Sequence, residues 1–253
     1  MTGLLALLLL QDPAALIEKL KSDDVETRAA AADELVKLGE PAIAALKKAI
    51  EGKEVEVQGR AEGILRRIGA KLARTSLKLV AVPEKKVYGP NETVKVRLKL
   101  TNAGPAPVVV VKENLFEIDE AAMAFSEIQS AALQGTGPDG KTWPIVNVST
   151  FSSDEPPPRI TVTVPASALV VLAPGESIVV AEEEAEPVVY VNRKAAASPH
   201  KPGTYRFAGS YRFSPDKTPK HVTLKIDGPV APLWECAFRG ELKAEVAEFD
   251  VKE

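Results

Sequence analysis

The spacing of apolar side chains changes once along this chain, close to Thr75. Before that position, apolar residues recur every three or four residues, the period that places them on one face of an α-helix. After it, they alternate with polar residues, as in a β-strand with one buried face. We therefore expect a multidomain α then all-β chain, with helices over residues 12–74 and an antiparallel β part over residues 75–253.

Capping residues mark the ends of four helices in the first part. The start signals are Asp12–Pro13, Asp23–Asp24 and Pro41, and the stop signals are Gly39, Gly52 and Gly69. The fourth helix carries apolar residues from Val55 to Ile68, so we expect it to end at Gly69.

Many positions of the first two helices recur 30 residues later with similar side chains. The pairs are Leu16/Leu46, Leu20/Ile50, Val25/Val55, Glu26/Glu56, Ala31/Ala61, Leu35/Leu65, Leu38/Ile68 and Gly39/Gly69. These two units resemble HEAT repeats, especially the short bacterial kind, with Arg28 at the usual arginine position and Gln58 at its equivalent. Because about three repeats are needed to bury a continuous core, we expect the pair to pack on the β part or on a partner.

Alternation in the β part is clearest in the segment ETVKVRLKLTN, where Val94, Val96, Leu98 and Leu100 share one face. Proline- and glycine-containing turns separate further strands. We expect these at 76–82, 107–112, 159–164, 168–172, 177–181, 187–192, 203–213, 221–227 and 240–252. The last one changes phase, which predicts a β-bulge near 246–247.

Three motifs follow one another in the β part, LKLTNAGPAPVVV, LAPGES and KPGTYRF. Their order resembles immunoglobulin-like β-sandwiches of exported bacterial proteins. The resemblance implies a fold and no activity, with Tyr205 bonding the backbone at a sheet corner. We expect one elaborated sandwich over residues 75–253, and two small sandwiches divided near Pro156–Pro158 are the alternative.

A seven-residue apolar run, Leu4 to Leu10, precedes the helices. We expect residues 1–11 to act as an export signal, which places the chain in the periplasm or outside the cell. No basic residue precedes the run and no A-x-A pattern follows it, so a first repeat helix in a cytoplasmic protein is the alternative. The run is too short to cross a bilayer, and we expect no membrane span in the mature chain.

Side chains that catalyse reactions or bind metals are scarce. The chain has one cysteine, Cys236, and two histidines, His200 and His221, which we expect at the surface. Lys and Arg number 12 against 12 Asp and Glu in residues 1–74, and 20 against 23 in the remainder. Neither part is basic enough to be held on nucleic acid by phosphate contacts. We expect no cofactor, no metal and no catalytic residue.

Two segments match known motifs only superficially. Residues Gly135–Thr142 fit the G-x-x-x-x-G-K-[ST] pattern of phosphate-binding loops, but Pro144 and a β-branched run replace the required helix. We expect a hairpin turn there. The acidic residues Glu182, Glu183, Glu184 and Glu186 lack calcium-loop spacing, so we expect a solvated loop.

Two sets of side chains are candidates for a binding surface. The first is a stripe along the fourth helix, Arg60, Arg67, Lys71 and Arg74. It is a solvated face or a surface for an acidic protein. The second is a row on one strand, Tyr205, Phe207, Tyr211 and Phe213. It is core packing or an exposed platform for sugar rings.

The sequence favours a non-catalytic protein–protein interaction or scaffolding protein. A sandwich that binds glycans or the cell envelope, with the helices as a spacer, is the second hypothesis. A hydrolase with a carboxylate pair brought together by the fold is the third.

Overall fold

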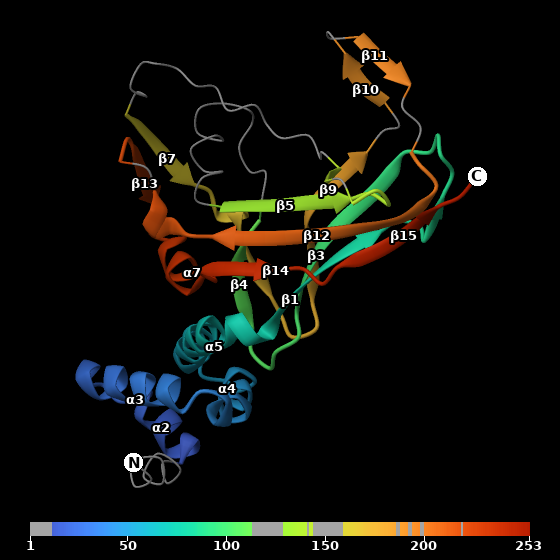
Figure 1. Cartoon of the computed structure of the whole chain (residues 1–253). Coiled ribbons are helices and arrows are strands. Elements are labelled where there is room, and N and C mark those ends of the chain that lie inside the picture. The colour runs from blue at the N-terminus through green and yellow to red at the C-terminus, as the bar shows by residue number, and fades with distance from the viewer. Residues whose placement is uncertain are drawn as a thin grey trace, which may run out of the picture.

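A helical part leads directly into a β part (Figure 1). The computed structural model describes residues 12–112, 129–140, 142–143, 159–185, 188–191, 194–197, 200–218 and 220–253. Helix α5 ends at Ser76 and strand β1 begins at Leu77, so the helix joins the strand without a loop. The predicted change of secondary structure near Thr75 is confirmed.

The helical part consists of two helix pairs. They are α2 (Pro13–Lys19) with α3 (Val25–Leu38), and α4 (Ile43–Ile50) with α5 (Val55–Ser76), with a 3-10 turn at Glu40–Ala42 before α4. The second pair starts 30 residues after the first, as the sequence repeat predicts. The Asp12 side chain accepts from Ala14 N, and that of Asp24 accepts from Thr27 N, so both aspartates are N-caps.

Gly69 does not end the fourth helix, contrary to the prediction. Helix α5 continues through it to Ser76, and Gly69 is buried against the β part. A Cβ atom at Gly69 would lie 1.8 Å from the backbone oxygen of Pro107. The glycine therefore permits a close helix–sheet approach, which a sequence cannot distinguish from a helix stop.

Mostly antiparallel sheets make up the β part. Strands β1 (Leu77–Pro83), β3 (Val94–Asn102) and β9 (Ser177–Ala185) form one sheet in the order β1-β3-β9. A larger sheet has the order β2-β15-β12-β5-β6, with β14 also paired to β12, and the pairs β4-β8, β7-β13 and β10-β11 are separate. The remaining bounds are β2 (Val87–Tyr88), β4 (Val108–Val111), β5 (Gln129–Thr136), β6 (Thr142–Trp143), β7 (Ile160–Val164), β8 (Leu169–Leu172), β10 (Val188–Val191), β11 (Lys194–Ala197), β12 (Gly203–Phe213), β13 (Val222–Ile226), α7 (Ala231–Cys236), β14 (Gly240–Lys243) and β15 (Ala247–Val251), with 3-10 turns at Ala166–Ala168 and Pro215–Lys217.

The two larger sheets share one hydrophobic core, and their strands cross in Figure 1. The Leu98 side chain of β3 packs directly on the backbone of Gly209 in β12, where a Cβ would lie 2.6 Å from a methyl carbon of Leu98. Nearby, the buried Tyr211 hydroxyl donates to Val111 O at 2.7 Å and accepts from Val111 N at 3.0 Å. This side chain therefore ties β12 to β4 through the core.

The β part forms a single packed unit among the described residues. Strands that precede residue 156 pair with strands that follow residue 158, as β3 does with β9 and β5 with β12. This pairing argues against two separate sandwiches. The prolines at 156–158 themselves lie outside the described residues.

The phase change in the last strand is confirmed as a bulge. Lys243 pairs with Ser210 and Ala247 pairs with Phe207, so three residues face two across the ladder. The predicted Tyr205 hydrogen bond is also present, since its hydroxyl donates to Lys201 O at 3.1 Å.

The segment that fits the phosphate-loop pattern is a hairpin, as predicted. Strands β5 and β6 pair antiparallel through Thr136 and Thr142, and Gly140 has a φ of 74° in the turn. A strand therefore follows the loop where nucleotide binding needs a helix. Lys141 lies outside the described residues.

The helical part packs on the β part, as its two repeats required. Ala106, from the loop between β3 and β4, is buried in the helical core with Leu35 and Ile68. Asn102 holds that loop, because its side-chain nitrogen donates to Ala106 O at 2.8 Å and its side-chain oxygen accepts from Gly104 N at 3.0 Å. The loop between β3 and β4 therefore contributes to the packing of both the helical part and the β part.

Candidate interaction groove

The basic stripe on α5 is largely exposed, and three of its members also bond to the neighbouring helices. Arg60 donates to Leu20 O at 2.7 Å, at the end of α2, and pairs with Glu56 at 2.8 Å. Arg67 pairs with Asp33 of α3 at 2.6 Å. Three of the four predicted residues therefore connect helices, because Lys71 also donates to Val36 O at 3.3 Å.

Arg74, the fourth member of the stripe, is exposed and lies one turn beyond Lys71. The stripe stays a candidate partner surface, and three of its members also hold α5 against α2 and α3.

Two adjoining pockets lie beside this stripe, between α3, α5 and α7. They have volumes of about 480 and 380 Å³. Arg67, Glu235 and Cys236 line both, so the pockets form one groove with a shared middle. Each volume is in the range of a binding site for a side chain or small ligand.

Basic side chains outnumber acidic ones along the groove. The basic ones are Arg28, Lys37, Arg60, Arg66, Arg67 and Lys71. The acidic ones are Asp33 and Glu235. The apolar lining includes Val25, Ala29, Ala32 and Pro232. The groove therefore combines a positive rim with an apolar surface.

Helix α7 supplies one wall of the groove and was not predicted from the sequence. It is six residues long and contacts α5. Trp234 of α7 packs edge-on against Phe213, with ring centroids 5.2 Å apart, which fixes the helix to the β core. Trp234 is thus anchored in the core, whereas the side chain of Trp143 lies outside the described residues.

Cys236 lies at the junction of the groove with the core. Its thiol is buried, and this burial raises its pKa. A raised pKa lowers the thiolate fraction at neutral pH, which makes the thiol a poor nucleophile. The geometry gives Cys236 a packing role.

The aromatic row on β12 is buried, so it is not a platform for sugars. Tyr205, Phe207, Tyr211 and Phe213 are each at most 5% exposed. Tyr205 and Phe207 stack on Phe249 of β15, with centroids 5.3 and 5.4 Å apart. Core packing accounts for this row, because the face of β12 that carries it faces the other sheet.

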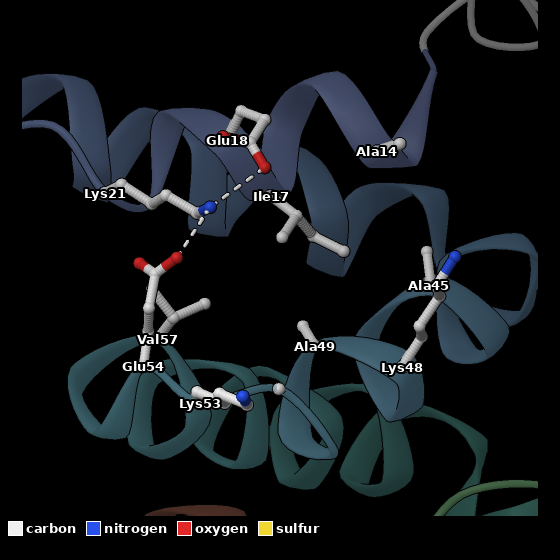
Figure 2. A pocket seen from close by; sticks show the side chains of 11 residues that line it. Ala14, Ile17, Glu18, Lys21, Ala45, Lys48, Ala49, Lys53, Glu54 and Val57 are labelled. Carbon is white, nitrogen blue, oxygen red and sulfur yellow. Dashed lines mark ion pairs between the residues drawn. The ribbon is translucent and has the colours of Figure 1, made fainter.

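A further pocket of about 280 Å³ lies between α2, α4 and the start of α5. Figure 2 shows Lys21 directed at two carboxylates, and its ammonium pairs with Glu18 at 3.1 Å and with Glu54 at 2.9 Å. These two partners raise the Lys21 pKa. Lys48 and Lys53 line the pocket as well, so three basic side chains stand against the two acidic ones.

The acidic run belongs to a strand and not to a loop. Glu184 pairs with Lys95 at 2.5 Å and Glu182 pairs with Arg97 at 2.7 Å, across the β3-β9 ladder. The Arg97 guanidinium lowers the pKa of Glu182. Glu186 and the side chain of Glu183 lie outside the described residues.

His200 is buried, contrary to the prediction of a surface position. It is 6% exposed and lies edge-on to Tyr205, with ring centroids 6.3 Å apart. His221 is half-buried. Within the described ranges, no three His, Cys, Asp or Glu side chains are grouped to hold a metal ion.

None of the described helices combines the length and apolarity needed to cross a bilayer. Residues 1–11, where we expect an export signal, lie outside the described residues.

Comparison with known proteins adds no family. No protein-family model matches the chain, and no curated protein matches it. Among solved structures it is similar to the Pseudomonas fluorescens alkylpurine DNA glycosylase AlkC bound to DNA containing an abasic site analog, with 14% identity and a TM-score of 0.28, over 96% of this chain and 53% of that one. It is also similar to a mutant β-glucosidase from Listeria innocua in complex with laminaribiose, with 11% identity and a TM-score of 0.27, over 70% of this chain and 16% of that one. The chain thus spans about half of the first protein and a small part of the second, and at such TM-scores neither likeness carries an argument.

Proposed function

We propose that this chain is a non-catalytic protein-interaction protein that receives a partner protein in the groove between α3, α5 and α7. The observation that carries the proposal is the groove itself, in which arginines stand beside apolar side chains on a rigid frame. Arginine is enriched among residues that dominate binding energy at protein interfaces. A partner that covers such a patch gains both apolar burial and charge-assisted hydrogen bonds.

Rigid packing of the groove walls supports the proposal. Helix α5 joins β1 directly, and α7 is anchored to the β core through Trp234. A preformed site binds with less loss of conformational entropy than one that orders on binding.

The architecture that we propose is a HEAT-like repeat pair followed by an immunoglobulin-like sandwich. The 30-residue offset of the two helix pairs supports the first assignment. The shared core of two sheets and the Tyr205 hydrogen bond support the second. We further propose export to the periplasm or the cell exterior, on the apolar run Leu4–Leu10, which N-terminal sequencing of the mature protein tests.

An affinity-capture experiment tests the groove. Ala29 is exposed on α3 and lines the groove, whereas the exposed Ala30 beside it does not. Tagged full-length wild type, Ala29→Trp and Ala30→Trp are used to capture proteins from the source organism, and circular dichroism establishes that all three fold. We expect captured proteins that Ala29→Trp loses and Ala30→Trp keeps. If Ala29→Trp captures every protein that wild type does, the proposal is wrong.

A further inference from the structure

We infer that the groove binds an acidic peptide segment of its partner, one with apolar side chains next to its carboxylates. This inference rests on the proposed function and gives the partner its chemistry. Three properties of the groove support the inference: the excess of basic over acidic side chains, the hydrogen-bond and ion-pair partners of the basic side chains, and the apolar wall.

The charge balance favours a negatively charged occupant. Six basic side chains and two acidic ones line the two pockets, while the whole chain has a net charge of −3. Glu34, Glu56 and Glu62, just outside the lining, pair with three of these cations, so the groove region keeps a small excess of positive charge in a chain that is negative as a whole. A local excess of positive charge attracts acidic partners and directs them to one site.

Two of the cations hydrogen-bond to backbone carbonyls, and their carboxylate neighbours, Asp24 for Arg28 and Asp33 for Lys71, act on them through charge alone. Arg28 donates to Ser22 O and Asp23 O at 2.7 and 2.8 Å, and Lys71 donates to Val36 O. These contacts orient the side chains and leave each with a full positive charge. A carboxylate arriving in the groove meets cations that are already positioned, which reduces the entropy lost on binding.

The remaining four cations of the groove have carboxylate partners, and Lys37 pairs with Glu34 at 2.6 Å and Arg60 with Glu56 at 2.8 Å. Arg66 lies 3.7 Å from Glu62, and Arg67 contacts Asp33 through one nitrogen of its guanidinium group. A guanidinium has five donor hydrogens, so a single contact leaves it able to bind a second carboxylate.

The apolar wall distinguishes a peptide from a polyanion. Val25, at the start of α3, is 66% exposed at the groove, and Ala29 and Pro232 line it nearby. A nucleic-acid backbone would leave these side chains uncovered and would place phosphates beside Asp33 and Glu235. A peptide with both acidic and apolar side chains would pair with the basic side chains of the groove and cover its apolar ones.

Selection from a phage-displayed library of random peptides on the full-length chain tests the inference. We expect the selected peptides to be enriched in Asp and Glu next to Leu, Ile, Val or Phe. They should bind wild type and Ala30→Trp but not Ala29→Trp. Groove-dependent peptides without that enrichment would overturn the acidic assignment and leave the proposed function standing. Peptides that bind Ala29→Trp as well as wild type would overturn both.

A second experiment reverses the charge of single lysine side chains. Lys71→Glu changes a groove cation, and Lys47→Glu makes the same change on the exposed face of α4, outside the groove. For a selected peptide measured by fluorescence anisotropy, we expect Lys71→Glu to weaken binding about tenfold, whereas Lys47→Glu should stay within about twofold. Equal losses in the two variants would overturn the placement of the carboxylates in the groove.

A labelled single-stranded oligonucleotide forms the third arm of the same assay. We expect binding to it to be weaker than to the peptide and equal in wild type and Ala29→Trp. Tight binding that Ala29→Trp abolishes would assign the groove to nucleic acid and overturn the inference.

Discussion

At the scale of single residues, the two repeats close the turn between their helices with different side chains, which share one equivalent carbonyl acceptor, Ser22 O in the first repeat and Gly52 O in the second. Arg28 donates to Ser22 O and Asp23 O in the turn between α2 and α3. Its counterpart Gln58 donates to Ile50 O at 2.9 Å and to Gly52 O at 2.7 Å in the turn between α4 and α5. The departure from arginine in the second repeat therefore preserves the role of closing the turn.

Truncation of either side chain tests this equivalence. Arg28→Ala and Gln58→Ala each leave two turn carbonyls without their donor, so we expect each to lower the free energy of unfolding by about 1–3 kcal/mol. Urea unfolding measures the change. The exposed Arg74→Ala is the control, which should stay within about 0.5 kcal/mol of wild type.

Acid should weaken the contact between α3 and α5. Arg67 lowers the pKa of Asp33 in the folded chain, so the pair contributes stability above the unfolded pKa of Asp33, near 4. That contribution is lost as the pH falls through the folded pKa. We expect Asp33→Asn to unfold with a shallower dependence on pH below about 4 than wild type. Urea midpoints measured at a series of acidic pH values test this, and identical slopes would contradict it.

At the scale of elements, periodicity predicted long or regular segments and missed short ones. Strand β12 runs over Gly203–Phe213, the predicted range, because aromatic and polar side chains alternate along it. The two-residue strand β2 and the six-residue helix α7 contain too few positions to show a period. Strand β5 was missed because its sequence, QSAALQGT, lacks β-branched and aromatic residues for most of its length.

The length of α5 was underestimated for a tertiary reason, which a matched pair of glycine substitutions tests. In Gly69→Ala the new methyl group meets the Pro107 carbonyl, so we expect a loss of about 3 kcal/mol of stability. In Gly59→Ala nothing lies within 4 Å, so we expect a gain of up to about 1 kcal/mol from helix propensity. Chemical unfolding of both variants decides, and a neutral Gly69→Ala would contradict the close contact.

Two tyrosines of β12 provide another matched pair. Tyr211→Phe removes a buried hydroxyl that bonds both Val111 N and Val111 O, and we expect a loss of about 2 kcal/mol. Tyr205→Phe removes one part-buried bond to Lys201 O, and we expect about 1 kcal/mol or less. Thermal unfolding that ranks the two in the opposite order would contradict the role given to Tyr211.

At the scale of the whole molecule, the groove was only partly predictable. Arg60, Arg67 and Lys71 share a face of one helix, so their spacing alone grouped them. Arg28 on α3 and Glu235 on α7 join them only through the fold, since more than 150 residues separate α5 from α7. No local pattern in the sequence predicts that residues so far apart along the chain lie close together in the fold.

The two parts should unfold together. Ala106 of the β part is buried in the helical core, and α5 continues into β1. Loss of either core therefore uncovers apolar surface of the other, which makes partial unfolding costly. We expect far-ultraviolet circular dichroism and tryptophan fluorescence to give one common urea midpoint. Two separated midpoints would show that the cores are independent.

The direct junction of Ser76 with Leu77 also bears on how such a chain can evolve. Modules exchanged between genes are usually divided at exposed, flexible segments that tolerate a crossover. Here the border runs through a helix end whose neighbours, Gly69 and Ala73, are buried. A recombination event at this border would separate surfaces that fit only each other. We therefore expect the helix pair to be inherited with its β partner as one unit.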